Sequence, residues 1–397
     1  MFDIIVVGAR CSGASAAMLL ARKGYRVAMI DKDPPGSDML HSTHIVQPIA
    51  VSKLKKWELL ANLEAECPSF ESYSFDFGVA LIDGKPPAVD GDARAFCPRR
   101  KVLDPILVSA AVSEGVTYMP STKVIDVTRT GERVDGVRFV TAGGAEQTIK
   151  GELVIGADGP GSTIAARVNA RQYREASAQQ VTMWGYWSGI PGRGLDVKSD
   201  GGRAVWLIPS SGGDSMVGVS WEMTRYKSLR GEVKKGYYAS IAELSPLLST
   251  QLKQDLLSSE LRVGSTRTYL RAPHGPGWVL LGDAGHTKDP CSAQGITDAF
   301  IDVDECTSLI DAGLRGERNL DEGLADWHVA RDARLIPFLE MSLKMAQFQP
   351  PDESETALYQ AIAKSDAATT QFLGLISEST NPGDFFAAEN IGRLLAS

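Results

Sequence analysis

A glycine-rich turn near the N-terminus constrains the fold more than any other feature of this sequence. Residues 2–7 form a short apolar run rich in β-branched side chains, which is typical of a strand buried on both faces. The turn Gly8-Ala9-Arg10-Cys11-Ser12-Gly13 follows, and the small and apolar residues after it predict a helix that ends at Gly24. A second apolar run over residues 25–30 predicts another strand. The order of strand, helix and strand predicts a βαβ unit.

The spacing within this unit indicates a dinucleotide site. Gly8 permits a tight turn out of the strand, and Gly13 lets the helix pack close to the sheet. Asp31 ends the second strand, 31 − 8 = 23 positions after Gly8, where a carboxylate can accept hydrogen bonds from an adenosine ribose. Arg10 replaces the middle glycine of the usual GxGxxG pattern. The alternative is an ordinary turn with small residues for packing, but the flanking pattern favours the dinucleotide.

Two further turns follow short strands that are predicted to be buried. Residues 153–155 lead into Gly156-Ala157-Asp158-Gly159, which alone is a weak signal because Asp-Gly marks many turns. Residues 278–281 lead into Gly282-Asp283-Ala284, and a loop containing Pro290 then reaches Gly295. Asp283 is predicted to lie at the sheet edge, where its carboxylate can bind polyol hydroxyls. Gly295 is predicted to begin a helix whose N-terminus carries about half a positive charge.

Together these motifs resemble those of the FAD-dependent aromatic hydroxylases of the p-hydroxybenzoate hydroxylase type, the single-component flavoprotein monooxygenases. The family's third motif, GDAxHxxxPxxAxG, matches at Gly282, Asp283, Ala284, His286, Pro290, Ala293 and Gly295. The three motifs lie in the family's order within about residues 1 to 325. The resemblance implies an α/β fold: a Rossmann-like FAD-binding βαβ domain of the glutathione-reductase type, an inserted antiparallel β-sheet domain that binds the substrate, and a helical C-terminus.

The expected domains are discontinuous in the sequence. The FAD-binding domain is expected over residues 1–70, 99–180 and 273–325. The substrate-binding sheet is expected over 71–98 and 181–272, where short strand-like runs alternate with Gly-rich turns. Residues 326–397 are expected to form a C-terminal helical segment, and they match no motif of the family. Helical patterns are also expected over residues 51–63 and 232–257.

The resemblance implies which residues surround one FAD molecule. Asp31 would bind the adenosine ribose, Ser12 and Gly13 the pyrophosphate, and Asp283 the ribityl chain. Backbone N–H groups of Gly295, Ile296 and Thr297 would face the pyrimidine edge of the flavin. The full expected set of cofactor-binding residues is Gly8, Ser12, Gly13, Asp31, Lys32, Arg100, Val124, Asp158, Asp283, Gly295, Ile296 and Thr297.

Candidate catalytic and substrate-binding residues come from two other segments. Pro290 is expected beside the site of hydroxyl transfer, and His44 ends a loop (residues 41–44) that approaches the flavin in this family. A solvated polar loop is an equally good interpretation of that segment. In the strand over residues 181–187, Thr182, Trp184 and Tyr186 share one face. With Trp206 they are expected to line the substrate pocket and to favour an aromatic or otherwise flat, apolar substrate.

The implied reaction uses FAD, NADPH or NADH, and O2 to hydroxylate or epoxidise a small molecule through a flavin C4a-hydroperoxide. Three alternatives remain open. One is an FAD-dependent reductase of the geranylgeranyl-reductase type, and another is a flavin-binding sensor without turnover. The third is a flavin-dependent halogenase, although Ala204 interrupts the WxWxIP motif of halogenases before Trp206-Leu207-Ile208-Pro209.

Composition excludes several other classes of function. The net charge is 41 − 49 = −8 and no dense basic patch is visible, which argues against nucleic-acid binding. No apolar run approaches the length needed to span a bilayer, and the N-terminus has no secretory signal pattern. The five cysteines form no CxxC pair, and no His, Cys or acidic cluster has the spacing of a metal site. We therefore expect a cytoplasmic enzyme without a metal, whose partners are a small-molecule substrate and O2.

Overall fold

The computed structural model describes residues 1–39 and 44–396; residues 41–43 of the loop before His44 lie outside this part. The first sheet contains the predicted βαβ unit, with β1 (Phe2–Val7), α1 (Cys11–Arg22) and β2 (Val27–Ile30). Its other central strands are β7 (Thr117–Met119), β10 (Glu146–Gly156), β18 (His274–Gly275) and β19 (Trp278–Leu280). The order is β18-β19-β10-β1-β2-β7, and the strands from β19 to β7 run parallel. The ends of β1, β2 and β10 therefore meet at one edge.

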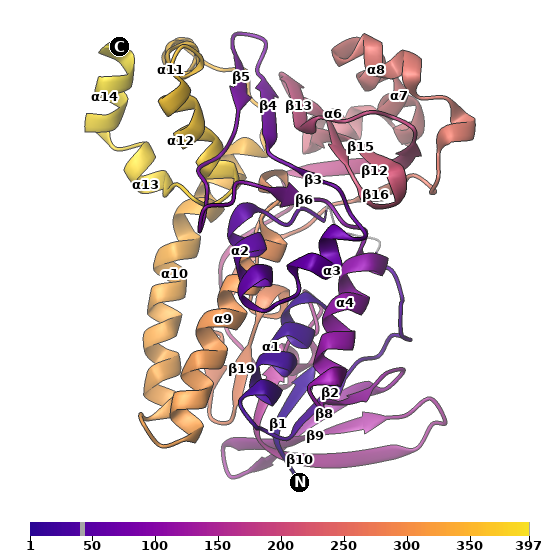
Figure 1. Ribbon diagram of the computed structural model, residues 1–397, viewed down its shortest axis with the longest axis vertical. Helices are drawn as coiled ribbons and strands as arrows, with labels where there is room; N and C mark the ends of the chain where they lie inside the picture. The colour runs from indigo at the N-terminus through magenta and orange to yellow at the C-terminus, as the bar shows by residue number, and fades with distance from the viewer. Residues whose placement is uncertain (40–43, 397) are drawn as a thin grey trace.

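Two different layers cover this sheet. On one face α1 lies between α4 (Arg100–Ser113) and α9 (Gly295–Leu314), and α10 (Leu320–Met345) packs on α9 (Figure 1). Ala14, Ala16 and Ala17 of α1 are fully buried and permit this close packing. The other face is covered by β8 (Lys123–Thr130), β9 (Arg133–Val140) and the short α5 (Thr163–Arg167). α2 (Pro48–Lys56) and α3 (Leu60–Glu64) pack on α9 and α4.

A second, seven-stranded sheet stands at the opposite end of the molecule (Figure 1). In order across the sheet its strands are β16 (Arg262–Gly264), β12 (Gln180–Ser188), β15 (Asp214–Glu222), β14 (Arg203–Pro209), β13 (Gly194–Asp200), β4 (Ser72–Asp76) and β5 (Leu81–Gly84). Alternation along β12 places Trp184 and Tyr186 on one face and Met183 and Trp187 on the other. The second face packs on α7 (Val233–Leu244) and α8 (Pro246–Gln251), while α6 (Met223–Ser228) follows β15.

The C-terminal helices cover the remaining face of the second sheet. α10 runs along the molecule from the first sheet toward the second, and α11 (Glu353–Ala363), α12 (Asp366–Ile376), α13 (Pro382–Phe385) and α14 (Ala388–Ala396) follow it (Figure 1). α11 and α12 contact β5. Within the described residues, no helix combines the length and the apolar character needed to cross a membrane.

Two smaller sheets and short 3-10 turns connect these layers. The sheets are β11 (Gln172–Ala176) with β17 (Thr268–Arg271) and β20 (His286–Thr287), and β3 (Ser69–Phe70) with β6 (Ala95–Phe96). The 3-10 turns are η1 (Ser211–Gly213), η2 (Gln254–Leu256), η3 (Gly282–Ala284) and η4 (Pro290–Ser292). The α/β class with an added sheet and a helical C-terminus is confirmed.

Three local expectations were wrong. The helical pattern over residues 51–63 divides into α2 and α3, because Glu58 adopts a left-handed backbone conformation, with φ of 62°, between them. The pattern over 232–257 divides at Pro246, which lacks the N–H needed inside a helix and instead opens α8. The second sheet is not wholly antiparallel, since β4 runs parallel to β13.

Candidate active site

A large cavity lies between the edge of the first sheet, the second sheet and the C-terminal helices, with a volume of about 2120 Å³. A small-molecule site is commonly about 300–1,000 Å³, so this cavity has room for more than one ligand of ordinary size. Its dinucleotide half is lined by Val7, Gly8, Asp31, Arg100, Val124, Asp158 and Asp283. Its apolar half is lined by residues of the second sheet and of the C-terminal helices, including Phe77, Trp206, Met341, Tyr359 and Phe372.

The glycine-rich turn forms part of the wall of the dinucleotide half of the cavity. Gly8 has a φ of 101°, and a Cβ there would lie 2.2 Å from the carbonyl oxygen of Ala157. A Cβ at Gly13 would lie 1.8 Å from the carbonyl oxygen of Gly8, so the first turn of α1 packs directly on the turn. Both positions therefore require glycine for steric reasons.

The backbone conformation of Arg10 shows why the turn does not require glycine at its middle position. Its backbone is extended, with φ of −105°, a conformation that any residue adopts. The guanidinium lies 3.1 Å from a carboxylate oxygen of Asp33 and 2.8 Å from one of Asp104. Arg10 thus connects the segment after β2 with α4 along the cavity wall.

Two aspartates shape the backbone at the same edge. Asp31 accepts hydrogen bonds from the N–H groups of Ala9, at 2.6 Å, and Asp33, at 2.8 Å. Asp158 accepts from the Ser162 hydroxyl and from the N–H of Thr163, and so fixes the start of α5. Burial raises the pKa of Asp158, although these hydrogen bonds oppose the shift.

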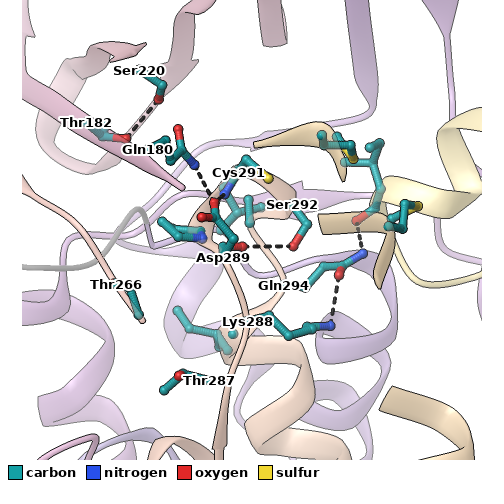
Figure 2. A pocket seen from close by; sticks show the side chains of 18 of the residues that line it. Gln180, Thr182, Ser220, Thr266, Thr287, Lys288, Asp289, Cys291, Ser292 and Gln294 are labelled. Carbon is teal, nitrogen blue, oxygen red and sulfur yellow. Dashed lines mark hydrogen bonds between the residues drawn. The ribbon is translucent and has the colours of Figure 1, made fainter. Parts of the chain in front are cut away.

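The loop between β20 and α9 forms the wall where the two halves meet the C-terminal region. Asp289 accepts a hydrogen bond from the N–H of Cys291 at 3.1 Å and another from the Gln180 amide (Figure 2). Burial raises the pKa of Asp289. Pro290 opens η4 and lines the cavity. Gln180 at the start of β12 therefore connects the second sheet to the residue before Pro290.

A buried ionic cluster lies beneath the start of α9. The Lys288 ammonium lies 2.9 Å from an Asp298 carboxylate oxygen and 2.6 Å from Oε1 of Glu378. It also donates to Oε1 of Gln294, whose amide donates to the carbonyl oxygens of Leu375, at 2.9 Å, and Ile376 (Figure 2). Burial, reinforced by the Asp298 carboxylate, raises the pKa of Glu378 to about 8. The cluster joins the loop before α9 to the end of α12.

His44 lies on the cavity wall near the second sheet. It is buried, and its ring faces Tyr186 with the ring centroids 6.1 Å apart. Burial, followed by the positive charges of Arg100 and Arg99, holds the pKa of His44 well below its usual range. The imidazole is therefore neutral at pH 7.

A family model described as an FAD binding domain matches residues 1–335, which is most of the chain. This chain belongs to the FAD-dependent aromatic hydroxylase family. It is accordingly an FAD-dependent oxidoreductase. The motifs around Gly8, Asp158 and Asp283 all lie inside the matched residues, whereas α11 to α14 lie outside them.

Curated relatives of this flavoprotein include different activities. It is 26% identical to a 6-methylpretetramide 4-monooxygenase of Streptomyces rimosus over 92% of this chain and 88% of that protein. It is 28% identical to a tryptophan 2-halogenase of Chondromyces crocatus over 74% of this chain but only 58% of that longer protein. A solved flavoprotein/dehydrogenase from Cytophaga hutchinsonii superposes with a TM-score of 0.84 at 19% identity, covering 100% of this chain and 98% of that one. This last likeness shows the fold alone.

The dinucleotide half of the flavoprotein's cavity fits FAD in two respects besides its size. The side chain of Asp283 is exposed on the cavity wall, and its carboxylate has no hydrogen-bond partner among the described residues. Gly295 is also exposed there, and a Cβ added to it would meet open space. α9 begins at Gly295, so unpaired backbone N–H groups of its first turn lie at the cavity. These are donors and acceptors for a polar ligand with a flat ring system.

Most of the residues expected to bind FAD, to bind the substrate or to act in catalysis line this cavity. They are Gly8, Ser12, Asp31, Lys32, His44, Arg100, Val124, Asp158, Thr182, Trp184, Trp206, Asp283, Pro290, Gly295 and Ile296. Gly13, Tyr186 and Thr297 are not among the lining residues. Gly13 packs on Gly8, and Thr297 is fully buried in α9. Tyr186 instead lies under the Arg99 guanidinium, 4.4 Å from the ring centroid.

Sequence reasoning missed two groups of residues at the flavoprotein's site. One is the buried cluster of Lys288, Asp298 and Glu378; the only signal was a Lys-Asp pair inside the third motif. The other is the C-terminal wall of the apolar half. Apolar residues at helical spacing in α11 and α12 predict a packed face, but not the surface that this face covers.

Proposed function

We propose that this flavoprotein is a monooxygenase that uses NAD(P)H and O2 to hydroxylate or epoxidise an aromatic or otherwise flat, apolar small molecule. The observation that carries the proposal is one continuous cavity whose first half fits FAD and whose second half is walled by apolar and aromatic side chains. Pro290 and the first turn of α9 lie on the wall of that same cavity. The S. rimosus relative, which aligns over nearly its whole length, is named as a monooxygenase.

Five residues of the dinucleotide half would hold FAD. Asp31 uses two of its roughly four acceptor positions for backbone N–H groups, which leaves acceptors for the adenosine ribose. Ser12 at the start of α1 would contact the pyrophosphate. Asp283 would accept hydrogen bonds from the ribityl hydroxyls. The N–H groups of Gly295 and Ile296, with the positive end of α9, would face the pyrimidine edge of the flavin.

The bound FAD supplies the electron transfer from NAD(P)H and the activation of O2. In the hydroxylation, one oxygen atom enters a substrate C–H bond, the other leaves as water, and NAD(P)H loses a hydride. The chain contributes position and exclusion of water. Pro290 would limit the motion of the loop beside the reacting carbon, and the Asp289–Gln180 hydrogen bond would hold that loop against the second sheet. Because its lowered pKa makes the neutral His44 imidazole a weak base, we expect it to accept a hydrogen bond from a substrate hydroxyl and not to remove the proton.

The nicotinamide would bind transiently over the FAD-binding lobe, because the sequence has no second GxGxxG unit. By analogy with the family alone, we expect NADPH to be preferred over NADH. Stopped-flow measurement of flavin reduction with each nucleotide would test this choice, and equal or faster reduction by NADH would reverse it.

Oxygen-18 gas distinguishes the proposed reaction from its rivals. FAD-loaded protein should oxidise NAD(P)H faster with an aromatic substrate and place labelled oxygen in the product. A halogenated product on addition of chloride or bromide would instead support the halogenase function, which the C. crocatus relative suggests and Ala204 disfavours. A hydrogenated product formed without O2 would support a reductase. FAD binding without any turnover would support a sensor.

A further inference from the structure

We propose that the substrate of this site is an uncharged, extended aromatic molecule with at least two rings, lying along the C-terminal side of the cavity. This inference rests on the proposed function, since it assumes that the apolar half holds the substrate. Two independent features carry it: a continuous wall of aromatic rings, and the lack of any buried, unpaired cation facing the apolar half within the described residues.

The aromatic wall consists of Phe77, Tyr359, Phe372 and Phe386, all of which line the cavity. Phe77 stacks on Tyr359 with the ring centroids 4.5 Å apart and the planes 17° apart. Phe372 meets both rings edge-on, at 6.2 Å from Phe77 and 6.0 Å from Tyr359. Phe372 also contacts Phe385, which contacts Phe386. The wall thus continues from the segment after β4, across α11 and α12, to the end of α13.

Such a wall is longer than one ring needs. Flat rings gain most when they pack against several aromatic faces or edges in sequence. Met341 and Met345 of α10 also line this half, and their flexible side chains can adapt to a range of ring outlines. Aromatic rings and methionines together favour an extended, flat ligand over a single small ring.

Within the described residues, each cation that lines the cavity is paired, lies beside the first sheet, or is exposed to solvent. Arg10 and Arg100 lie in the dinucleotide half and pair with Asp104. Arg271 donates to the backbone carbonyls of Ala284 and Pro160. Lys32 follows β2 and Lys123 begins β8, so both lie beside the first sheet. Arg267 pairs with Glu175, and Lys288 pairs with two carboxylates. Lys344 of α10 does line the apolar half, but it is exposed, so water and salt screen its charge.

A carboxylate substrate would therefore enter an apolar space without a counter-ion. A buried charge needs a partner and hydrogen bonds to offset its loss of hydration. Asp289, a buried carboxyl group on the cavity wall, would add like charge when ionised. A neutral ring system avoids both penalties, so the electrostatics of the wall select against acids.

Equilibrium dialysis with matched probes tests the inference without relying on turnover. FAD-loaded protein is titrated with phenol, 2-naphthol and 6-hydroxy-2-naphthoate. We expect 2-naphthol to bind about tenfold more tightly than phenol, because the second ring packs on the wall. We expect 6-hydroxy-2-naphthoate to bind at least about tenfold more weakly than 2-naphthol. Equal binding of the two naphthalene probes, or preference for phenol, would overturn the proposal.

A charge introduced into the apolar half provides a gain-of-function test. Val197 of β13 lines this half, so Val197→Lys should raise the affinity for 6-hydroxy-2-naphthoate by about tenfold relative to 2-naphthol. Val263→Lys places the same side chain on exposed β16 of the same sheet and should change neither affinity. An unchanged ratio in a folded, FAD-loaded Val197→Lys protein would show that the probes bind elsewhere.

The monooxygenase function and the substrate class can each be overturned without the other. If the naphthalene probes follow the expected order but no aromatic compound accelerates NAD(P)H oxidation, the monooxygenase function is wrong and the description of the cavity stands. If turnover occurs with charged single-ring acids and these bind as tightly as 2-naphthol, the function stands and the substrate class is wrong.

Discussion

The two walls of the cavity are built by different kinds of interaction. In the FAD-binding lobe the wall is mainly backbone, held by glycines that admit no Cβ and by aspartates that accept backbone N–H groups. In the C-terminal helices the wall is apolar side chains that pack on the second sheet. A backbone wall tolerates few residue types at each position, whereas an apolar wall tolerates many of similar volume. The first wall therefore produces a recognisable motif and the second does not.

The Lys288 cluster nevertheless joins the two regions. Removing its ammonium group should cause the largest loss in the free energy of unfolding. Lys288→Met leaves Asp298 and Glu378 buried without their ammonium partner. Breaking a buried ion pair from one side commonly costs about 3–5 kcal/mol. We expect a loss near the lower end, because Asp298 keeps the Arg334 guanidinium at 3.4 Å and burial already favours the protonated form of Glu378. Urea unfolding with both far-ultraviolet circular dichroism and tryptophan fluorescence would measure it.

Lys344→Met is the matched control, because Lys344 is exposed and its ion pair with Glu355 should contribute little. If Lys288→Met is as stable as Lys344→Met, the cluster does not hold the C-terminal helices to the loop before α9. If the circular dichroism and fluorescence transitions have different midpoints only in Lys288→Met, the C-terminal helices unfold as an independent unit once the Lys288 cluster is broken.

A second pair of variants compares the two walls directly. Gly13→Ala adds only a methyl group, but that group would meet the Gly8 carbonyl oxygen, and we expect a loss of about 3 kcal/mol. Phe372→Leu removes a whole ring from the C-terminal wall and should cost less than about 1.5 kcal/mol, since the site borders open cavity. Gly392→Ala, in open space on α14, is the control for the glycine change. A larger loss of stability for Phe372→Leu than for Gly13→Ala would show that the apolar wall tolerates change less than the backbone wall.

The same contrast explains what the sequence could predict. The βαβ unit, the turn at Asp158 and the helix start at Gly295 follow from local steric rules, and the structure places them at one cavity. The C-terminal wall depends on which surface α11 and α12 cover, a question of tertiary packing that helical periodicity does not answer. The Lys288–Glu378 contact joins residues 90 positions apart, and neither belongs to a local pattern that identifies the other.

Smaller effects should appear where the FAD-binding wall uses a side chain instead of backbone. Asp283→Ala removes a carboxylate that faces the cavity without a partner among the described residues. Loss of hydrogen bonds to a charged acceptor is worth about 1–3 kcal/mol, so the Kd for FAD should rise about tenfold to a hundredfold. Fluorescence titration of the apoprotein measures this. Asp283→Asn, which keeps one acceptor, should lose less, and FAD binding equal to wild type in both variants would remove Asp283 from the cofactor site.

The smallest expected effect, taken per pH unit, is a change in how stability depends on pH. Glu378 has one carboxylate oxygen that is buried without a hydrogen-bond partner among the described residues, and its φ is 62°. The groups that determine its charge are Lys288, Asp298 and Arg334. Burial raises its pKa to about 8 from a usual value of 4.5, so the folded protein binds a proton that the unfolded chain releases. The stability associated with this proton is complete below pH 4.5 and is lost as pH rises toward about 8.

Glu378→Gln should remove that pH dependence. Between about pH 6 and about pH 8 the wild-type protein should lose up to about 1.4 kcal/mol of stability per pH unit from this residue, whereas the neutral glutamine titrates nowhere in the range. The difference between the two urea-unfolding curves should therefore slope with pH, and histidine titrations common to both proteins cancel. Glu389→Gln, an exposed acid of α14, should run parallel to wild type. Parallel curves for Glu378→Gln would mean that Glu378 is already ionised at neutral pH, with Lys288 stabilising its charged form. The Lys288–Glu378 contact would then be an ordinary ion pair, and Glu378 would not hold the proton that burial is expected to retain.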